Sequence, residues 1–294
     1  MIAVDWGTSS FRAYRLDDSG QIVDRRSASA GILTVTDGGF AETLENHVRD
    51  WLDSGERVLL LSGMIGSRQG WKEAPYASAP AGAEEIARAL VPVNVRPGID
   101  GWIVPGVVTV NADGIHDVMR GEETQILGIL HDLGPGSHTL CLPGTHSKWV
   151  EVQHGTITGF RTFMTGEVFA VLKDHSILGR IMNSSAPYDR QAFADGLHPF
   201  GRRKRTAAPP VRRARRVPLR RSRRRALRDF LSGLLLGHEL RQARGNAVVN
   251  LLGAGVLVDR YAYACEVLGR STRILDPDAV VAGQWQIARS RRLV

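Results

Sequence analysis

The feature that most constrains the fold is a pattern of strand, glycine turn and strand that occurs twice along the chain. Its first copy reads AVDWGTSSFRAYRL, in which Asp5 follows an apolar run and Gly7 opens a turn rich in hydroxyl groups. Its second copy reads LCLPGTHSKWVEV, with Gly144 and Thr145 at the corresponding place. Apolar runs broken by glycine turns are typical of β-hairpins, so each copy predicts a hairpin that begins an α/β unit.

The order of elements around each copy predicts a duplicated α/β organisation. After the first hairpin come a third strand, an amphipathic helix and a buried strand, and a similar order follows the second hairpin. We place the boundary near residue 135, so that residues 1–134 form an N-terminal domain and residues 135–294 a C-terminal domain. The expected elements include strands at 2–6, 10–16, 21–29 and 57–66 and helices at 114–134 and 167–182.

The overall composition favours a globular protein of the cytoplasm. The chain has 294 residues, of which 43% are hydrophobic, and no apolar run reaches the roughly 18–20 residues that span a bilayer. Its first residues read as a strand rather than as a secretion signal. Cys141 and Cys265 are too few and too distant in sequence for a disulfide framework or a metal motif. We therefore expect a cytoplasmic protein with no membrane partner.

Three turns have the chemistry of a nucleotide site. A carboxylate at a strand end can hold hydrated Mg²⁺, because this cation takes oxygen ligands, and glycine turns offer N–H groups to phosphate. A small-residue turn between a strand and a helix admits a flat ring such as adenine. The candidate ATP-binding residues are Asp5 (also the Mg²⁺ residue), Gly7, Thr8, Ser9, Ser10, Gly144, Thr145, His146, Lys148, Gly253, Ala254 and Gly255.

Each of these features also has a purely structural interpretation. Glycine, threonine and serine are common in ordinary hairpin turns, and Lys148 can be a solvated lysine on a strand. The interpretation as a nucleotide site depends on the occurrence of two such hairpins, one in each predicted domain. We expect them to face each other across the phosphates of ATP, in a cleft between the domains.

An ordered set of motifs resembles the sugar kinases of the actin/hexokinase/Hsp70 superfamily and, more narrowly, the 2-dehydro-3-deoxygalactonokinase family. The motifs cover about residues 1–195 and 226–290 and read AVDWGTSSFRAYRL, LSGMIGSRQGWKEAPY, DVMRGEETQILG, LPGTHSKWVEV, FRTFMTGEVFAVL and LRDFLSGLLLGHEL. The resemblance implies an α/β fold of two RNase-H-like domains with mixed sheets. It also implies ATP- and Mg²⁺-dependent phosphorylation of 2-dehydro-3-deoxy-D-galactonate at its 6-hydroxyl, in galactonate catabolism.

A kinase of this kind needs a carboxylate that accepts the hydroxyl proton. The segment MRGEETQILG resembles the Gly-Asp helix start that carries this base in related carbohydrate kinases, which places the base at Glu122, after Gly121. This chain has Glu where those relatives have Asp, so Asp117 and Glu123 are alternatives. The structural alternative is an acidic first helical turn, which the helix dipole favours.

The predicted substrate is an anion with several hydroxyl groups. Arg68 follows a buried strand and can donate two parallel hydrogen bonds to a carboxylate, and a helix start can offer free N–H groups to an anion. The alternative for each arginine is a surface charge. The candidate substrate-binding residues are Arg12, Ser67, Arg68, Gln69, Trp71, Thr165 and Gly166.

One segment departs from the family pattern and accounts for the net charge of +8. Residues 201–228 hold thirteen Arg, one Lys and no acid, and without them the chain has 24 basic and 30 acidic residues. The atypical stretch 199–225 is either a surface for nucleic acid or other anions, or the product of two compensating reading-frame shifts. We favour the frame shifts, because the basic run 201–228 has no aromatic residue suited to stacking on bases and the family pattern resumes abruptly at residue 226.

The sequence therefore predicts a sugar-acid kinase whose partners are ATP and its small substrate. A homodimer is compatible with this prediction, and we do not expect a nucleic-acid partner. Two alternatives stay open. One is a kinase for a related sugar or sugar acid, and the other is a non-catalytic, nucleic-acid-associated protein of the same fold.

Overall fold

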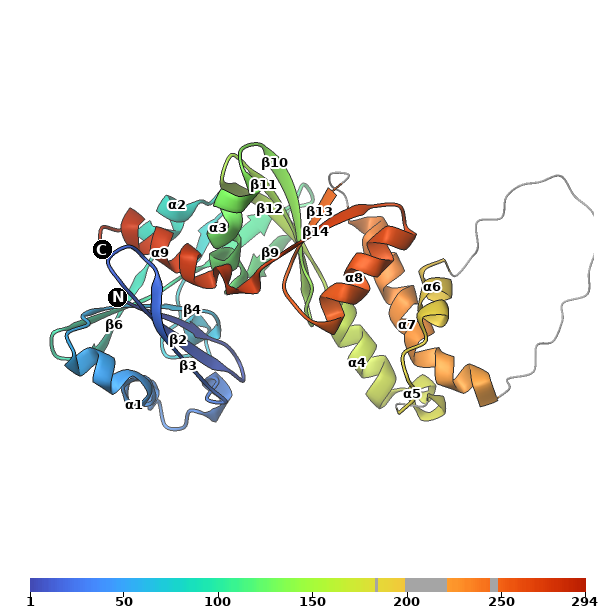
Figure 1. Ribbon diagram of the computed structural model, residues 1–294, viewed down its shortest axis with the longest axis horizontal. Helices are drawn as coiled ribbons and strands as arrows, with labels where there is room; N and C mark the ends of the chain where they lie inside the picture. The colour runs from blue at the N-terminus through green and yellow to red at the C-terminus, as the bar shows by residue number, and fades with distance from the viewer. Residues whose placement is uncertain (183–184, 199–220, 244–247) are drawn as a thin grey trace, which may run out of the picture. The chain divides into compact units, whose positions relative to one another are not determined.

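The computed structural model describes residues 1–182, 185–198, 221–243 and 248–294 (Figure 1). The chain divides into two compact units. Unit 1 comprises Met1–His138, Val150–Arg161 and Leu275–Val294, and unit 2 comprises Thr139–Trp149 and Thr162–Ile274. Most of the predicted Arg-rich stretch, residues 199–220, lies outside the described residues.

Unit 1 is built on a mixed six-stranded sheet of order β3-β2-β1-β4-β7-β6. The first three strands run antiparallel, β1 pairs with β4 in parallel, and β4 pairs with β7 in parallel. This sheet confirms the predicted α/β class and the predicted hairpin with its third strand. Its strands are β1 (Ile2–Trp6), β2 (Phe11–Leu16), β3 (Ile22–Ala28), β4 (Val58–Ser62), β6 (Val91–Arg96) and β7 (Ile99–Ile103).

Helix α1 (Phe40–Asp53) covers this sheet with an apolar face at helical spacing. Its buried residues Leu44 and Trp51 belong to the same core cluster as Trp6 and Phe11 of the first hairpin. The Trp6 and Phe11 rings meet edge to face, with centroids 5.0 Å apart. Each fully buried side chain of this size stabilises the fold by about 1.5–3 kcal/mol, so the hairpin that carries Asp5 is firmly anchored.

The predicted helix over 114–134 is wrong in its first part. Residues His116–Met119 form strand β9, which pairs with β8 (Gly106–Val110), and β5 (Tyr76–Ser78) completes this three-stranded sheet. Helix α3 begins only at Glu122 and ends at Leu133. Gly121 has a φ of 103°, a left-handed conformation that residues inside an α-helix do not adopt. The chain therefore cannot form one continuous helix through Gly121.

The C-terminal helix α9 (Val280–Ser290) packs against α3 within unit 1. The contact is backbone to backbone: a Cβ at Gly128 would lie 1.8 Å from Ala279 O, and a Cβ at Gly283 would lie 1.8 Å from Thr124 O. Residues 135–138, 150–161 and 275–294 belong to the predicted C-terminal domain but fall in unit 1, so the compact units and the predicted domains have different bounds. Unit 1 also contains α2 (Ala83–Arg88) and the 3₁₀ turns η1 (Ile32–Thr34), η2 (Met64–Gly66) and η3 (Pro277–Ala279).

The second sheet has the order β12-β11-β10-β13-β14, and β10 pairs with β13 in parallel. In both sheets, the three strands that come first in the sequence lie side by side in reverse order, and the earliest of them pairs in parallel with the fourth strand. This shared order agrees with the predicted duplication. The strands are β10 (Ser137–Leu142), β11 (Ser147–Gln153), β12 (Thr156–Phe163), β13 (Val248–Leu252) and β14 (Ser271–Leu275).

The helices of unit 2 pack as a group around α7 (Figure 1). The predicted helix 167–182 is two helices, because Ser176 leaves the helical conformation and its Oγ accepts a hydrogen bond from the N–H of Leu178. Among the described residues, no helix is long and apolar enough to cross a bilayer. The helices are α4 (Thr165–His175), α5 (Ile177–Ile181), α6 (Arg190–Leu197), α7 (Arg221–Gln242) and α8 (Val256–Val267).

Candidate active site

The first glycine turn is held rigidly between β1 and β2. The N–H of Gly7 donates to Ser10 O at 2.9 Å, and the N–H of Ile32 donates to Gly7 O at 3.0 Å. Gly31 packs so closely that a Cβ there would lie 2.3 Å from Ser9 N. Thr8, Ser9 and Ser10 are exposed on this rigid frame, so their hydroxyl groups are accessible to a ligand.

Asp5 is a largely buried carboxyl group paired with Arg12, whose Nη2 lies 2.5 Å from Asp5 Oδ2. Burial raises the pKa of Asp5, and the charge of Arg12 and its hydrogen bond oppose that shift. Among the described residues, no three His, Cys, Asp or Glu side chains form a metal-ligand cluster. A single carboxylate still fits hydrated Mg²⁺, which keeps several waters and takes other ligands from substrate phosphates.

Three segments of unit 1 meet beside Asp5. Gly63, directly after β4, has a φ of 92°, and a Cβ there would lie 2.8 Å from Trp6 O and 3.2 Å from Asp5 Oδ1. A Cβ at Gly121, directly before α3, would lie 3.3 Å from the Cα of Gly63. The ends of β1 and β4 and the start of α3 are therefore in contact, which brings the predicted metal residue near the predicted base, Glu122.

The three candidate bases have different environments. Glu122 is half-buried at the first position of α3, and its Oε2 accepts the N–H of Arg120 at 3.0 Å. Glu123 is fully buried, and it accepts hydrogen bonds from Gly121 N–H at 2.7 Å and from Thr124 Oγ1 at 2.9 Å. Asp117 lies on β9, opposite Thr109. Accessibility favours Glu122 over Glu123, and the helix start favours it over Asp117, which is also half-buried. The role of Glu122 as the base stays a prediction.

The enclosure of Glu123 predicts a pH-dependent stability. Burial, and next the charge of Glu122, raise the pKa of Glu123 to about 8. The folded state therefore favours the protonated carboxyl of Glu123. The contribution of this carboxyl to stability is full below its unfolded pKa near 4.5 and is lost as the pH rises toward 8. Glu123→Gln keeps a neutral side chain of this shape. We expect the melting temperature of the variant, relative to the original protein, to rise between pH 5 and pH 8, and a constant difference would contradict the assignment.

The predicted substrate loop is only partly arranged for binding. The side chain of Arg68 is 87% exposed and its Nε donates to Glu73 Oε1 at 3.0 Å, while Gln69 is exposed. Trp71 packs against the core cluster of unit 1, which is a structural role. The Oγ of Ser67 is buried and has no hydrogen-bond partner within the described ranges. Arg12 lies with Asp5 rather than in this loop.

The second glycine turn, in unit 2, is packed against the start of α4. A Cβ at Gly166 would lie 2.7 Å from Gly144 O and 2.8 Å from Thr145 Cα, and the N–H of Glu167 donates to Thr145 O at 3.1 Å. His146 is exposed, and its Nε2 forms a hydrogen bond with the carboxyl group of Glu167. The structure thus brings the predicted phosphate turn together with the predicted substrate residues at the start of α4, Thr165 and Gly166.

Lys148 is not the solvated strand lysine of the structural alternative, and its role in ATP binding stays a prediction. Its side chain is buried, and its Nζ donates to Thr162 Oγ1 on β12 at 2.7 Å. The turn predicted to hold adenosine lies directly before α8, with Gly253 at a φ of 144° and Gly255 at 79°. Ala254 and Gly255 are exposed. Only glycine adopts these two conformations without strain.

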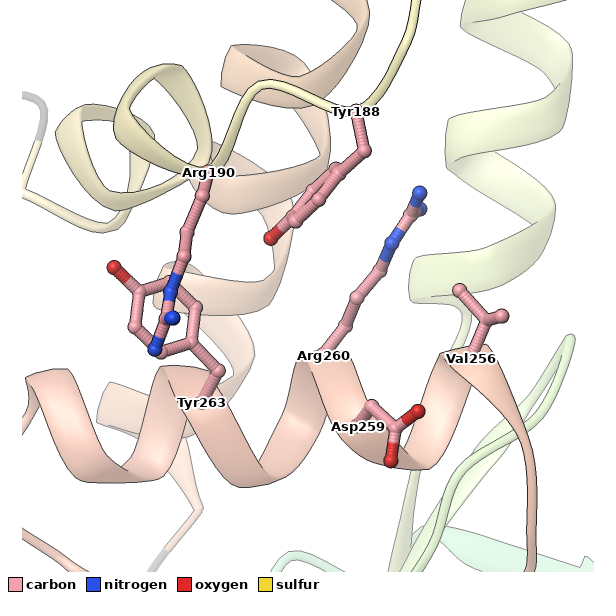
Figure 2. Close-up of a pocket in the computed structure, with 6 residues that line it drawn as sticks. All are labelled: Tyr188, Arg190, Val256, Asp259, Arg260 and Tyr263. Carbon is pink, nitrogen blue, oxygen red and sulfur yellow. The ribbon is translucent and has the colours of Figure 1, made fainter.

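A cavity of about 410 Å³ lies in unit 2, next to this turn, and Figure 2 shows the side chains that line it. The Cζ of Arg190 lies 3.9 Å from the centroid of the Tyr263 ring, and the Cζ of Arg260 lies 4.9 Å from the centroid of the Tyr188 ring. The volume lies within the range of small-molecule sites, and aromatic walls with a few polar groups are typical of them. The cavity is lined by Tyr188, Arg190, Val256, Asp259, Arg260 and Tyr263.

Arg260 also lines a second cavity of about 70 Å³, together with Gly144, Thr165 and Gly166. Its buried Nε has no hydrogen-bond partner in the part of the chain that the structure describes. Arg260 thus lies beside both the aromatic cavity and the glycine turn. Sequence reasoning missed this residue, although the spacing of Val256, Arg260 and Tyr263 places them on one face of a helix.

The comparisons with known proteins find relatives along nearly the whole chain. A family model described as 2-keto-3-deoxy-galactonokinase matches residues 5–287. The "Probable 2-dehydro-3-deoxygalactonokinase DgoK1" of Rhizobium meliloti (strain 1021) is 38% identical over 98% of this chain and 96% of its own length. The 2-dehydro-3-deoxygalactonokinase of Escherichia coli (strain K12) is 34% identical over 98% of this chain and 97% of its own length.

A solved structure leads to the same family. The crystal structure of a candidate 2-dehydro-3-deoxygalactonokinase from Sinorhizobium meliloti superposes with a TM-score of 0.84, at 34% identity and with 98% of each chain covered. The family match, the two curated relatives and this structure all extend over nearly the whole chain. The chain therefore belongs to the 2-keto-3-deoxy-galactonokinase family.

Proposed function

We propose that this chain transfers the γ-phosphoryl group of ATP to the 6-hydroxyl of 2-dehydro-3-deoxy-D-galactonate. The products are 2-dehydro-3-deoxy-6-phosphogalactonate and ADP, and the step belongs to galactonate catabolism in the cytoplasm. The observation that carries the proposal is the meeting of Asp5, Gly63 and Gly121 in a chain whose relatives are named as kinases of this substrate. This contact supports the proposal, because Asp5, the proposed Mg²⁺ residue, then lies near the half-buried Glu122, the proposed base.

The residues of unit 1 have distinct roles in this proposal. Glu122 accepts the proton of the 6-hydroxyl while that oxygen forms a bond to the γ-phosphorus and the bond to the β-phosphate oxygen breaks. The exposed turn Gly7–Ser10 donates hydrogen bonds to phosphate oxygens. Asp5 would hold Mg²⁺ through water, and this ion, when bound, neutralises charge on the phosphates.

The residues of unit 2 are assigned to the nucleotide. The aromatic cavity of Figure 2 takes the base, because stacking between a flat ring and an aromatic or guanidinium face is favourable. Gly144 and Thr145 take phosphate oxygens. Arg260 lines both cavities and is suited to donate to the nucleotide from its guanidinium.

Arg68 is the candidate for the substrate carboxylate. Its ion pair with Glu73 is solvent-exposed, and exposed pairs stabilise a fold by about 1 kcal/mol or less. A substrate carboxylate can therefore replace Glu73 as the partner of Arg68 at a small cost in free energy. Two parallel hydrogen bonds from the guanidinium give the geometry that distinguishes a sugar acid from a neutral sugar.

The test is ADP release by the purified full chain, measured with ATP, Mg²⁺ and 2-dehydro-3-deoxy-D-galactonate. We expect turnover with this substrate and much slower turnover with its C4 epimer and with neutral hexoses. In Arg260→Met we expect KM for ATP to rise about tenfold, which corresponds to about 1.4 kcal/mol, with little change in KM for the sugar acid. The matched control is Arg180→Met on α5, where the arginine is exposed.

Two outcomes would change the assignment. Faster turnover with another sugar or sugar acid would identify a related kinase. Absence of turnover, together with salt-sensitive DNA binding that disappears when residues 201–228 are deleted, would identify a nucleic-acid-associated protein instead.

A further inference from the structure

A buried glutamine on the C-terminal helix contacts both strands that lead into the candidate catalytic centre. Gln284 of α9 is fully buried. Its Nε2 lies 2.8 Å from Val4 O on β1, and 3.1 Å from both Leu60 O and Ser62 Oγ on β4. Val4 directly precedes Asp5, and Ser62 directly precedes Gly63. The amide of Gln284 therefore links β1 to β4 at the ends that lead into the candidate catalytic centre.

The neighbouring residue on α9 contacts the third segment of the centre. Gly283 lies against the first turn of α3, where a Cβ would approach Thr124 O to 1.8 Å. Thr124 is two residues after Glu122. Two adjacent residues of α9 thus contact the segments that carry Asp5, Gly63 and Glu122.

The chemistry of Gln284 distinguishes it from a packing residue. An apolar side chain could fill this interior position without hydrogen bonds, and a buried polar group is costly unless it is paired. The Oε1 of Gln284 has no partner among the described residues, so its burial carries a cost that an apolar side chain would not have. Its N–H groups donate to the backbone carbonyls of Val4 and Leu60 and to the hydroxyl of Ser62. Val4 and Ser62 are the residues directly before Asp5 and Gly63, so these contacts constrain the backbone at both positions.

We propose that Gln284 is a positioning residue for phosphoryl transfer, which fixes the Asp5 carboxylate relative to the Glu122 carboxylate through β1, β4 and α9. The inference rests on the proposed function, and on the roles assigned there to Asp5 and Glu122. Small displacements of reacting groups reduce a rate strongly, by about 10²-fold for 1 Å. Loss of the Gln284 donors should therefore affect kcat more than the binding of either substrate.

The test compares Gln284→Met with Ile287→Val in the full chain. Methionine has a similar length and no donor, and Ile287 is a fully buried residue one turn later on α9, so its variant reports a general loosening of the helix. We expect kcat of Gln284→Met to fall about tenfold to hundredfold, with KM for ATP and for the sugar acid within about threefold. We expect Ile287→Val to keep kcat within about twofold, although it loses a methyl group from the core.

A second measurement does not depend on activity. Amide hydrogen exchange should accelerate at residues 5–7, 63–64 and 121–124 in Gln284→Met and stay unchanged there in Ile287→Val. Unchanged kcat in an active Gln284→Met protein, or equal losses of kcat in both variants, would overturn the inference. If the original protein has no kinase activity, the proposed function fails, and the exchange data alone decide whether Gln284 holds these segments.

Discussion

Asp5→Asn is expected to lower kcat by about 10²–10³-fold, the loss typical of removing one preorganised electrostatic group from a catalytic site. The substitution keeps the size of the side chain and removes its negative charge. It also frees Arg12, whose side chain is 37% exposed and can be solvated, so we expect the fold to persist. Initial rates at saturating ATP, sugar acid and Mg²⁺ would measure the effect.

Asp100→Asn is the matched control for this variant. Asp100 lies on β7 in the same sheet and is exposed to solvent. We expect its kcat to stay within about twofold of the original value, because surface substitutions rarely change a fold by more than about 0.5 kcal/mol. If Asp5→Asn retained kcat within about threefold, Asp5 could not be the metal residue, and the first glycine turn would lose its assigned role.

Hairpins and glycine turns could be predicted because their signals are local. The apolar run before Asp5 and the turn at Gly7 lie within a few residues of each other, and the strand-turn-helix pattern around Gly255 is equally compact. Secondary structure in such segments depends mainly on neighbouring residues. The helix over 114–134 failed for the opposite reason, because β9 forms only by pairing with β8, a separate strand of the same small sheet.

The contacts that assemble the site could not be predicted from the sequence. Gly63 and Gly121 are both isolated glycines in sequence, and only the structure shows them in van der Waals range. Lys148 carries a charge suited to phosphate, but its partner Thr162 comes from the next strand. Glu122 and Glu123 have nearly identical chemistry, and the packing of α3 alone makes the first accessible and the second enclosed.

Glu239 is a buried carboxyl group of unit 2 that links α7 to two other elements, and its removal should produce the largest loss of stability. Glu239 of α7 is fully buried and accepts hydrogen bonds from three donors on two other elements. They are Ser147 Oγ at 2.8 Å and Trp149 Nε1 at 2.8 Å, both on β11, and Tyr261 OH at 3.0 Å on α8. Ser147 directly follows the second glycine turn, and Tyr261 lines the cavity beside it.

Glu239→Leu should lower the free energy of unfolding by about 2–6 kcal/mol, because the buried donors of Trp149 and Tyr261 would lose their acceptor, at a cost of about 1–3 kcal/mol each. Ser147 Oγ can still donate to Phe163 O at 3.3 Å. Glu239→Gln keeps one acceptor oxygen and should lose about half as much. Glu266→Leu removes an exposed carboxyl from α8 and should change stability by about 0.5 kcal/mol or less. Urea unfolding followed by tryptophan fluorescence would measure all three, because the Trp149 indole is a direct partner of Glu239. Equal stability of the Glu239→Leu and Glu266→Leu proteins would show that this network does not hold the glycine turn to α7 and α8.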